Sequence, residues 1–435
     1  MRVLLVDPPF NSFMHYDKWY FPSSLAQLAA VSHAANHDAL VYDGDKYFYK
    51  DPATRQRDIL IKKQHLYYDG VDNFEHEIWQ HFKKVLHDFN PDIVGVSVFT
   101  CKLKSAINTL KLVREFNPAI KTCVGGAHVT ALPETFVSKD YVDGVFCGFA
   151  DLTFPEWLED KCPKGIIRGD SSKIEIYKLP YVRRKSLMFP EYYNSRDIGV
   201  VTMNRGCSAK CTFCSNSFMW PGSSNFRTSE SIIAELNELL QDWKIGKKVR
   251  VGDETFNEVP KEAMRTAKIL KDFGLSWEAS VRWNIKKDLL EYFMDCGCTE
   301  IHIGLESGSD KALRYMRKGC NKRLIREKAK MVNSLGIKWH LFSIAGFPVE
   351  TVEDIKETME LALEIKPTSI SLNSFSPLPG TEDYKRIPGI TPEFASTINQ
   401  LNPNHCFSEH MDLQTFKDIF VKMSKVFNDY NNRSL

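Results

Sequence analysis

The sequence carries no marked excess of charge of either sign. Its 435 residues include 57 Lys and Arg against 55 Asp and Glu, which leaves a formal net charge of +2. A chain without a basic field is not drawn to nucleic acid or to an anionic membrane surface, so we expect neither as a partner. Hydrophobic residues make up 43% of the chain, which is typical of a globular protein and excludes a mainly disordered or collagen-like one.

Long apolar runs and abundant cysteines are also absent. No stretch approaches the ~20 consecutive apolar residues that a membrane-spanning helix needs. The N-terminus, Met1–Pro9, is too short in its apolar part for a signal peptide. We therefore expect a cytoplasmic protein. Its 11 cysteines are an odd number, and in a reducing compartment they predict thiols or metal ligands in place of disulfides.

Residues 1–160 alternate short apolar runs with helical patterns, which predicts a doubly wound parallel sheet. A polar and aromatic insertion, Tyr47–Phe74, interrupts the rhythm. Residues 161–195 are irregular and are expected to link two domains, with the basic triplet Arg183–Lys185 on the surface. The expected strands are Val3–Val6, Ala39–Tyr42, Ile93–Val98, Thr122–Val124 and Gly144–Cys147. The expected helices are Leu25–Ala35, His76–Phe89, Leu103–Phe116 and Leu132–Val137.

A second alternating series begins near residue 198. Six strand–helix units over residues 196–385 predict a (β/α)6 partial barrel, and residues 386–435 are expected to form a short helical extension. The expected strands are Gly199–Met203, Lys248–Gly252, Ser276–Val281, Glu300–Leu305, Lys338–Ile344 and Ser369–Phe375. The expected helices are Glu230–Trp243, Lys261–Phe273, Lys286–Asp295, Arg323–Leu335 and Val352–Ile365.

Three closely spaced cysteines follow the first strand of this second series. Cys207, Cys211 and Cys214 have the spacing Cys-x3-Cys-x2-Cys. A structural zinc site normally takes four ligands, and no fourth Cys or His lies at finger spacing. A cubic iron–sulfur cluster also normally takes four cysteines, so three leave one iron with the open position that catalysis needs. Active sites lie at the carboxyl mouth of such barrels, where this loop is expected.

The triplet, with Phe213 before its third cysteine, resembles the signature of the radical S-adenosylmethionine (SAM) superfamily. The resemblance implies that Cys207, Cys211 and Cys214 hold a [4Fe–4S] cluster whose open iron binds SAM. It also implies an external electron donor of the flavodoxin or ferredoxin type. In such enzymes the protein supplies binding and orientation, and the cofactors supply the difficult chemistry.

Five further motifs stand in the family's order after the triplet. Arg282 ends one of them, and the resemblance places it against the SAM carboxylate, which its guanidinium fork suits. The motifs are Val251–Phe256, Ala279–Arg282, Ile303–Ser309, Ala345–Pro348 with Glu350 and Thr351, and Ser376–Thr381. The SAM contacts that the resemblance implies are Phe213, Glu254, Arg282, Glu306, Ser307 and Gly346.

Two neighbouring strand ends in the first domain point to a bulky ligand. Gly125 and Gly126 let the backbone approach a ligand closely, and the helix that follows them offers its N-terminal amides. The pattern resembles the cobalamin-binding domain found in one branch of the radical SAM enzymes. The cobalamin contacts that this resemblance implies are Ser97, Phe99, Thr100, Gly125, Gly126 and His128. An Asp-x-His-x-x-Gly motif, which gives cobalamin a lower histidine ligand in mutases, is absent.

The resemblance implies a cobalamin-dependent radical SAM enzyme that methylates an unactivated carbon of a small molecule. In that branch a 5′-deoxyadenosyl radical removes a substrate hydrogen and methylcobalamin supplies the methyl group. The alternatives are a rearrangement, ring contraction or cyclisation without methyl transfer, a radical SAM enzyme without cobalamin, and a cluster-bearing regulatory or electron-transfer protein. A small molecule is favoured because residues 386–435 are too few for a large substrate-binding domain.

Overall fold

The computed structural model describes residues 1–18, 20–48, 62–170, 175–220, 224–398, 400–401 and 403–433. The chain forms two compact units. Unit 1 comprises residues 1–198, 230–245 and 388–397, and unit 2 comprises residues 199–229, 246–387 and 398–435. Within the described ranges, no helix has both the length and the apolar character needed to cross a membrane.

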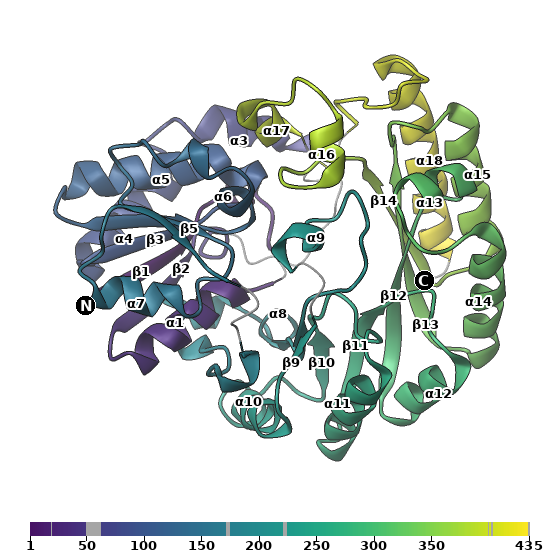
Figure 1. Ribbon diagram of the computed structural model, residues 1–435, viewed down its shortest axis with the longest axis horizontal. Helices are drawn as coiled ribbons and strands as arrows, with labels where there is room; N and C mark the ends of the chain where they lie inside the picture. The colour runs from purple at the N-terminus through teal and green to yellow at the C-terminus, as the bar shows by residue number, and fades with distance from the viewer. Residues whose placement is uncertain are drawn as a thin grey trace. The chain divides into compact units, whose positions relative to one another are not determined.

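Unit 1 is built on a six-stranded parallel sheet with the strand order β2-β1-β3-β4-β5-β6. Helices α4 (Glu77–Phe89) and α5 (Leu103–Phe116) pack together on one face, and α1 (Ser23–Ala34) and α7 (Thr153–Glu159) on the other (Figure 1). The strands are β1 (Arg2–Asp7), β2 (Asp38–Asp43), β3 (Ile93–Ser97), β4 (Lys121–Gly125), β5 (Gly144–Cys147) and β6 (Gly165–Arg168). The predicted doubly wound sheet is therefore confirmed.

The core of unit 1 lies between the sheet and its helices. Helix α4 has apolar residues at helical spacing, so one face of it is buried against the sheet while the other stays polar. The residues that α4 contributes to this core are Ile78, Trp79, Phe82, Val85, Leu86 and Phe89.

Three expectations for unit 1 were wrong. The helix expected over 132–137 is a single 3-10 turn, Pro133–Thr135, because Pro133 cannot continue a helix from α6 (Ala127–Ala131). Strand β6 lies in the segment expected to be irregular, because its short run of apolar residues is a weak signal. Arg184, expected on the surface, is fully buried and pairs with Glu235 at 2.6 Å. Within the insertion, α3 (Gln64–Gly70) is a helix, and residues 49–61 lie outside the described ranges.

Unit 2 is an open six-stranded parallel sheet with the order β14-β13-β12-β11-β10-β7, the predicted partial barrel. The strands are β7 (Val200–Val201), β10 (Lys248–Val251), β11 (Ser276–Val281), β12 (Cys298–Glu306), β13 (Lys338–Ala345) and β14 (Ser369–Ser374). The helices between them are α11 (Pro260–Asp272), α12 (Lys287–Asp295), α13 (Asp310–Tyr315), α14 (Lys322–Leu335) and α15 (Val352–Glu364). Helix α10 (Ser229–Gln241), which follows the first strand, belongs almost entirely to unit 1.

The two faces of this second sheet differ in polarity. Trp277 and Trp339 point outward, where Trp277 packs on Phe293 of α12 and the Trp339 indole N–H donates to Asn333 of α14 at 2.9 Å. The alternate residues of the same strands face the lumen and are mostly polar. Closed barrels of this class usually fill their interior with layers of branched apolar residues, so the polar lumen of unit 2 departs from that pattern.

Helix α18 (Leu413–Arg433) protects the edge of the sheet at β14. Asn431 accepts a hydrogen bond from the Ile370 amide and donates one to the Ile370 carbonyl, both at 2.8 Å. These bonds satisfy edge groups that could otherwise pair with another chain. The remaining elements are α8 (Ser195–Ile198), β8 (Asn204–Arg205), α9 (Asn216–Met219), β9 (Asn225–Phe226), α16 (Glu382–Arg386) and α17 (Pro392–Thr397).

Candidate active site

The three clustered cysteines lie on the loop between β8 and α9, at the carboxyl mouth of the unit 2 sheet. Asp253, just beyond β10, holds the start of this loop by accepting hydrogen bonds from the amides of Met203 at 2.7 Å and Asn204 at 3.1 Å. Burial raises the pKa of Asp253 to about 8, and these amide bonds oppose that shift. Gly206 has φ of +115°, a conformation that favours glycine, and turns the chain into the loop.

The sulfur atoms are held close to fixed partners. Cys207 Sγ lies 3.4 Å from Thr255 Oγ1 and 3.9 Å from Arg282 Nη1, and Cys211 Sγ lies 4.0 Å from the Arg317 carbonyl oxygen. Burial raises the pKa of the Cys214 thiol to about 11. A bound metal overcomes such a shift, because it displaces the thiol proton directly.

The spacing of the triplet fits a cluster better than one ion. Among the described residues, two groups of three candidate ligands have all their atoms within 4.8 Å of one another, and the cysteine triplet is not one of them. A single zinc ion with Zn–S bonds of about 2.3 Å needs its sulfurs closer than that. Three cysteines set wider apart suit the irons of a [4Fe–4S] cube.

Arg282 and Lys318 place positive charge beside the triplet. The Arg282 Nη2 atom donates to the Lys318 carbonyl at 3.2 Å, and the Arg282 amide donates to Asn257 Oδ1 at 2.9 Å. Lys318 Nζ pairs with Glu306 Oε1 at 2.7 Å. The structure thus brings the predicted residues Arg282 and Glu306 to the triplet. Lys318 and Asn257 were not predicted, because Lys318 stands in a polar run without a motif.

Of the other predicted SAM residues, some lie at the cysteine loop and others are buried deeper in unit 2. Glu254 accepts a hydrogen bond from the Gly206 amide at 3.3 Å, and Phe213 packs on Phe347 with ring centroids 5.7 Å apart. Glu254 therefore borders the cysteine loop, and Phe213 is part of it. Ser307 lies deeper, with 0% of its surface exposed.

The buried Glu350 side chain connects the Ile303–Ser309 motif to the Ala345–Pro348 motif. Its Oε1 accepts from the Ser307 hydroxyl at 2.7 Å, and its Oε2 accepts from the amides of Gly346 at 2.9 Å and Phe347 at 3.0 Å. Burial raises the pKa of Glu350 to about 7, against the effect of these bonds. Gly346 has φ of +97°, and a Cβ there would lie 2.7 Å from the Phe416 ring of α18. Ser307, Gly346 and Glu350 thus form a buried hydrogen-bonded cluster that connects the ends of β12 and β13.

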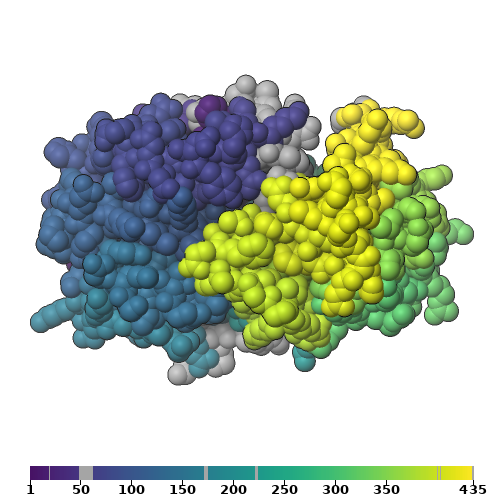
Figure 2. Space-filling view, turned by 90° about the horizontal axis from the view of Figure 1, so that it is seen from above, coloured from purple at the N-terminus to yellow at the C-terminus, as the bar shows by residue number. Residues whose placement is uncertain are grey.

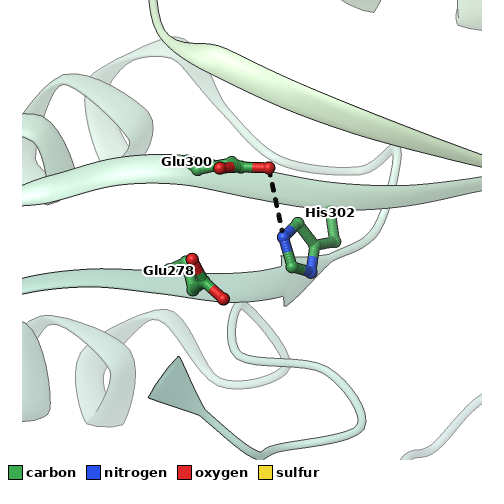
Figure 3. Close-up of side chains that lie close together, drawn as sticks. All are labelled: Glu278, Glu300 and His302. Carbon is green, nitrogen blue, oxygen red and sulfur yellow. Dashed lines mark ion pairs between the residues drawn. The ribbon is translucent and has the colours of Figure 1, made fainter. Parts of the chain in front are cut away.

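A row of polar side chains crosses the lumen face of the unit 2 sheet, before the carboxyl ends of the strands. Glu278 of β11 lies close to Glu300 and His302 of β12, and His302 Nε2 is 3.5 Å from Glu300 Oε1 (Figure 3). Lys248 Nζ already pairs with Glu278 at 2.9 Å, so this group is not a vacant cation site. The row continues as His340, whose ring contacts His302 with centroids 5.8 Å apart. The lumen therefore offers both hydrogen-bond donors and acceptors.

A cavity of about 510 Å³ opens beside the cysteine loop in unit 2. It borders Cys211 directly, so this side of the loop is accessible. The residues that line it include Ala209, Lys210, Cys211, Thr212, Phe218 and Arg317.

In unit 1, the carboxyl ends of β3, β4 and β5 present small residues side by side. Ser97, Gly125 and Gly148 end these strands or follow them directly. Gly126 has φ of +104°, and a Cβ there would lie 3.0 Å from the Val98 carbonyl oxygen. The half-buried backbone along this edge carries little side-chain bulk, which suits a broad, flat ligand such as a corrin. Phe99, next to this edge, is 51% exposed.

Thr100 and His128 link the turn after β3 to helix α6. Thr100 Oγ1 lies 3.1 Å from His128 Nδ1, and Thr135 Oγ1 lies 3.3 Å from His128 Nε2. His128 is 1% exposed. Burial lowers its pKa to about 4, so the ring is neutral at pH 7. Both ring nitrogens have partners. The buried His128 side chain therefore holds the turn at Thr100 in place.

A buried charge network fills the neighbouring part of the same edge. Lys18 Nζ pairs with Asp7 at 2.6 Å and with Asp43 at 2.9 Å, and Lys102 Nζ pairs with Asp7 at 2.6 Å and with Asp45 at 2.9 Å. Burial favours the neutral acid, but the two ammonium groups outweigh it and lower the pKa of Asp7 to about 2. The network ties β1 and β2 to the turn after β3.

Two family profiles match the chain in succession. The B12 binding domain profile covers residues 71–158, and the radical SAM superfamily profile covers residues 201–362. The chain is 24% identical to the cytidylyl-2-hydroxyethylphosphonate methyltransferase of Streptomyces wedmorensis, over 88% of this chain and 80% of that protein. It is 28% identical to an uncharacterized methyltransferase of Pyrococcus horikoshii, over 68% of this chain and 70% of that protein.

Solved structures share the fold over most of the chain. The radical SAM methyltransferase TsrM of Kitasatospora setae matches with a TM-score of 0.67 and 15% identity, over 89% of this chain and 75% of TsrM. The cobalamin-dependent radical SAM enzyme OxsB matches with a TM-score of 0.66 and 16% identity, over 89% of this chain and 60% of OxsB. The chain therefore contains a B12-binding domain followed by a radical SAM domain, the two kinds of domain whose cofactors are cobalamin and a [4Fe–4S] cluster with SAM.

Proposed function

We propose that this enzyme is a methyltransferase that adds a methyl group to an unactivated carbon of a polar small molecule. The observation that carries the proposal is the presence in one chain of a cobalamin-binding domain and a radical SAM domain. The bound cluster and SAM supply a radical that removes a hydrogen atom from the substrate, and cobalamin supplies the methyl group. The similarity to named methyltransferases supports the same activity.

In this proposal the three cysteines of the triplet ligate three irons of the cluster. Asp253 holds the start of their loop through the amides of Met203 and Asn204. The Thr212 amide donates to the Met316 carbonyl at 3.1 Å, which ties the loop to the turn after α13. A loop held on both sides keeps the three thiolates in position while the fourth iron stays open to SAM.

Around that open iron we assign SAM contacts to Arg282, Glu254, Glu306 and Phe213. Arg282 lies beside Cys207, and its guanidinium suits the SAM carboxylate. Glu254 accepts a hydrogen bond from Gly206 at the start of the loop, and Phe213, within the loop, packs on Phe347. Ser307 and Gly346 act in SAM binding as part of the buried hydrogen-bonded cluster that they form with Glu350.

For cobalamin we assign the carboxyl edge of the unit 1 sheet, at the ends of β3, β4 and β5. Ser97, Gly125 and Gly126 offer small side chains or bare backbone there, and Phe99 offers an exposed ring. Thr100 and His128 hold the turn after β3 in place, as their 3.1 Å contact supports.

We further propose that the substrate is polar and enters the lumen of unit 2. Polar side chains such as Glu278 and His302 line this lumen, and a polar ligand can exchange hydrogen bonds with them. An external reductant of the flavodoxin or ferredoxin type delivers the electron, and a reducing cytoplasm suits both the cluster and the free thiols.

The test uses the full chain, reconstituted without oxygen with iron, sulfide and hydroxocobalamin. It is incubated with titanium(III) citrate, SAM carrying a deuterated methyl group, and a panel of polar metabolites that begins with cytidylyl-2-hydroxyethylphosphonate. A methyltransferase yields 5′-deoxyadenosine, S-adenosylhomocysteine and a product with a deuterated methyl group. A product formed with 5′-deoxyadenosine and without S-adenosylhomocysteine contradicts methylation and supports a rearrangement or cyclisation.

A further inference from the structure

Residues 388–397, here called the return segment, belong to unit 1 although they follow β14 and α16 of unit 2 and precede α18 of the same unit. The chain leaves unit 2 after Ile387 and returns to it at Ile398. Within unit 1, helix α17 of the return segment packs against the 3-10 turn Thr100–Lys102. In Figure 2 the return segment lies within the part of the chain coloured yellow-green.

The return segment has a defined local structure. Thr391 caps α17 by accepting a hydrogen bond from the Phe394 amide on its Oγ1 at 3.1 Å, and its carbonyl accepts from the Ala395 amide at 2.8 Å. Pro392 starts the helix with its backbone angle already suited to it. Ala395 is buried. A capped helix with a buried contact is an ordered element, and it holds the neighbouring side chains in place.

The turn that α17 contacts is part of the proposed cobalamin edge. Thr100 begins this turn, directly after Phe99, and is hydrogen-bonded to His128. The Glu393 carboxylate of α17 lies near enough to His128 to oppose the lowering of its pKa by burial. The return segment therefore packs against the turn that Thr100 begins, and its Glu393 carboxylate lies in the electrostatic neighbourhood of His128.

The exposed side chains of α17 match the chemistry of a corrinoid. Phe394 is 38% exposed and Phe99 is 51% exposed, so apolar surface is available for the flat face of a macrocycle. The exposed Glu393 carboxylate can accept hydrogen bonds from the amide side chains at the corrin rim.

We propose that the return segment is a wall of the cobalamin site and that Phe394 and Glu393 contact the bound corrinoid. The proposal rests on the proposed function, because it needs cobalamin at the edge of unit 1. It adds a binding element that lies outside the cobalamin-binding domain in the sequence. The barrel and the cobalamin-binding domain are then coupled through the backbone at residues 387–398.

The first test measures hydroxocobalamin binding to the full chain by its absorption after gel filtration over a range of concentrations. We compare wild type with the E393A/F394A double variant and with the control F116A. Phe116 is 40% exposed at the C-terminal end of α5, so the control removes an equally exposed ring away from the carboxyl edge. The double variant is expected to raise the Kd about tenfold or more, while F116A leaves it unchanged and both keep wild-type iron.

The second test needs no variant. Amide hydrogen exchange of wild type is compared with and without hydroxocobalamin, and residues 388–397 are expected to exchange more slowly in its presence. Equal Kd values for wild type and the double variant, or unchanged exchange over 388–397 on a protein that binds cobalamin, overturn this inference alone. A wild type that binds no cobalamin overturns the proposed function, and this inference with it.

Discussion

The Arg282 guanidinium lies against the Cys207 sulfur, with Nη1 at 3.9 Å from Sγ. Its second nitrogen donates to the Lys318 carbonyl and its backbone amide donates to Asn257, so the residue is held at both ends. Arg282 directly follows β11, and Cys207 lies on the loop after β8. The fold thus places a fixed positive charge beside the first cysteine of the triplet, where we propose that the SAM carboxylate binds.

Replacing any cysteine of the triplet by alanine is expected to remove the cluster. C207A, C211A or C214A leaves two thiolates, which hold a [4Fe–4S] cube poorly, so iron should fall from about four per chain to a small fraction. Iron analysis after anaerobic reconstitution checks this. C406A is the matched control, because Cys406 donates to the Met411 carbonyl away from the triplet. Full iron content in C211A would count against the assignment.

Arg282→Lys is expected to separate SAM binding from cluster assembly. Lysine keeps the charge but loses the two-pronged guanidinium, and the loss of a charged hydrogen bond of about 1.5–3 kcal/mol weakens SAM binding by roughly tenfold or more. Equilibrium dialysis with SAM measures the Kd, and iron analysis should stay at the wild-type value. R326K is the control, since Arg326 pairs with Glu364 on the surface. Equal SAM affinity in R282K and wild type would remove Arg282 from the site.

Glu350 is expected to make stability depend on pH. Its pKa is about 7 in the folded chain against about 4.3 when unfolded. The folded state therefore binds the proton more tightly, and this contribution to stability is full below about pH 4 and is lost as the pH rises through 7. E350Q cannot titrate, so the free energy of unfolding of wild type relative to E350Q should fall by about 3 kcal/mol over that range. Urea unfolding at pH 5, 6, 7 and 8 checks the slope, and a constant difference contradicts it.

The buried network of unit 1 is expected to be sensitive to loss of one partner. K18M leaves Asp7 and Asp43 without their shared ammonium group. Removing one member of a buried ion pair typically costs about 3–5 kcal/mol, so the thermal midpoint of unit 1 should drop by several degrees. K84M is the control, because Lys84 forms an exposed pair with Asp88 and should change stability by less than about 0.5 kcal/mol. Equal melting of K18M and K84M would show that the network contributes little.

The sequence predicted the sheets well where turn residues bound each strand. Strands β5 and β11 match the expected ranges to the residue. The Thr351–Asp354 capping box fixes the start of α15, which was expected at the same residue. The short strand β6 was missed, since its four residues give a weak pattern and it depends on pairing with β5. A pattern of local residues cannot report such contacts.

The candidate site was predictable to the extent that it lies at strand ends. Carboxyl ends of parallel strands meet at one edge, so motifs far apart in the sequence could be expected to converge. Arg282 and Glu306 do so around the triplet. Lys318 and the burial of Arg184 were not predictable, because each depends on a tertiary partner, Glu306 and Glu235 respectively.

One chain contains a cobalamin-binding domain and a radical SAM domain, and we propose that it uses both cofactors to transfer a methyl group. The decisive measurement is mass spectrometry of the small molecules that the reconstituted enzyme forms from SAM with a deuterated methyl group. We predict that turnover with substrate forms S-adenosylhomocysteine and 5′-deoxyadenosine in equal amounts, and that the methylated product appears only when cobalamin is bound. Formation of 5′-deoxyadenosine at the same rate and with the same product when cobalamin is omitted would contradict this proposal.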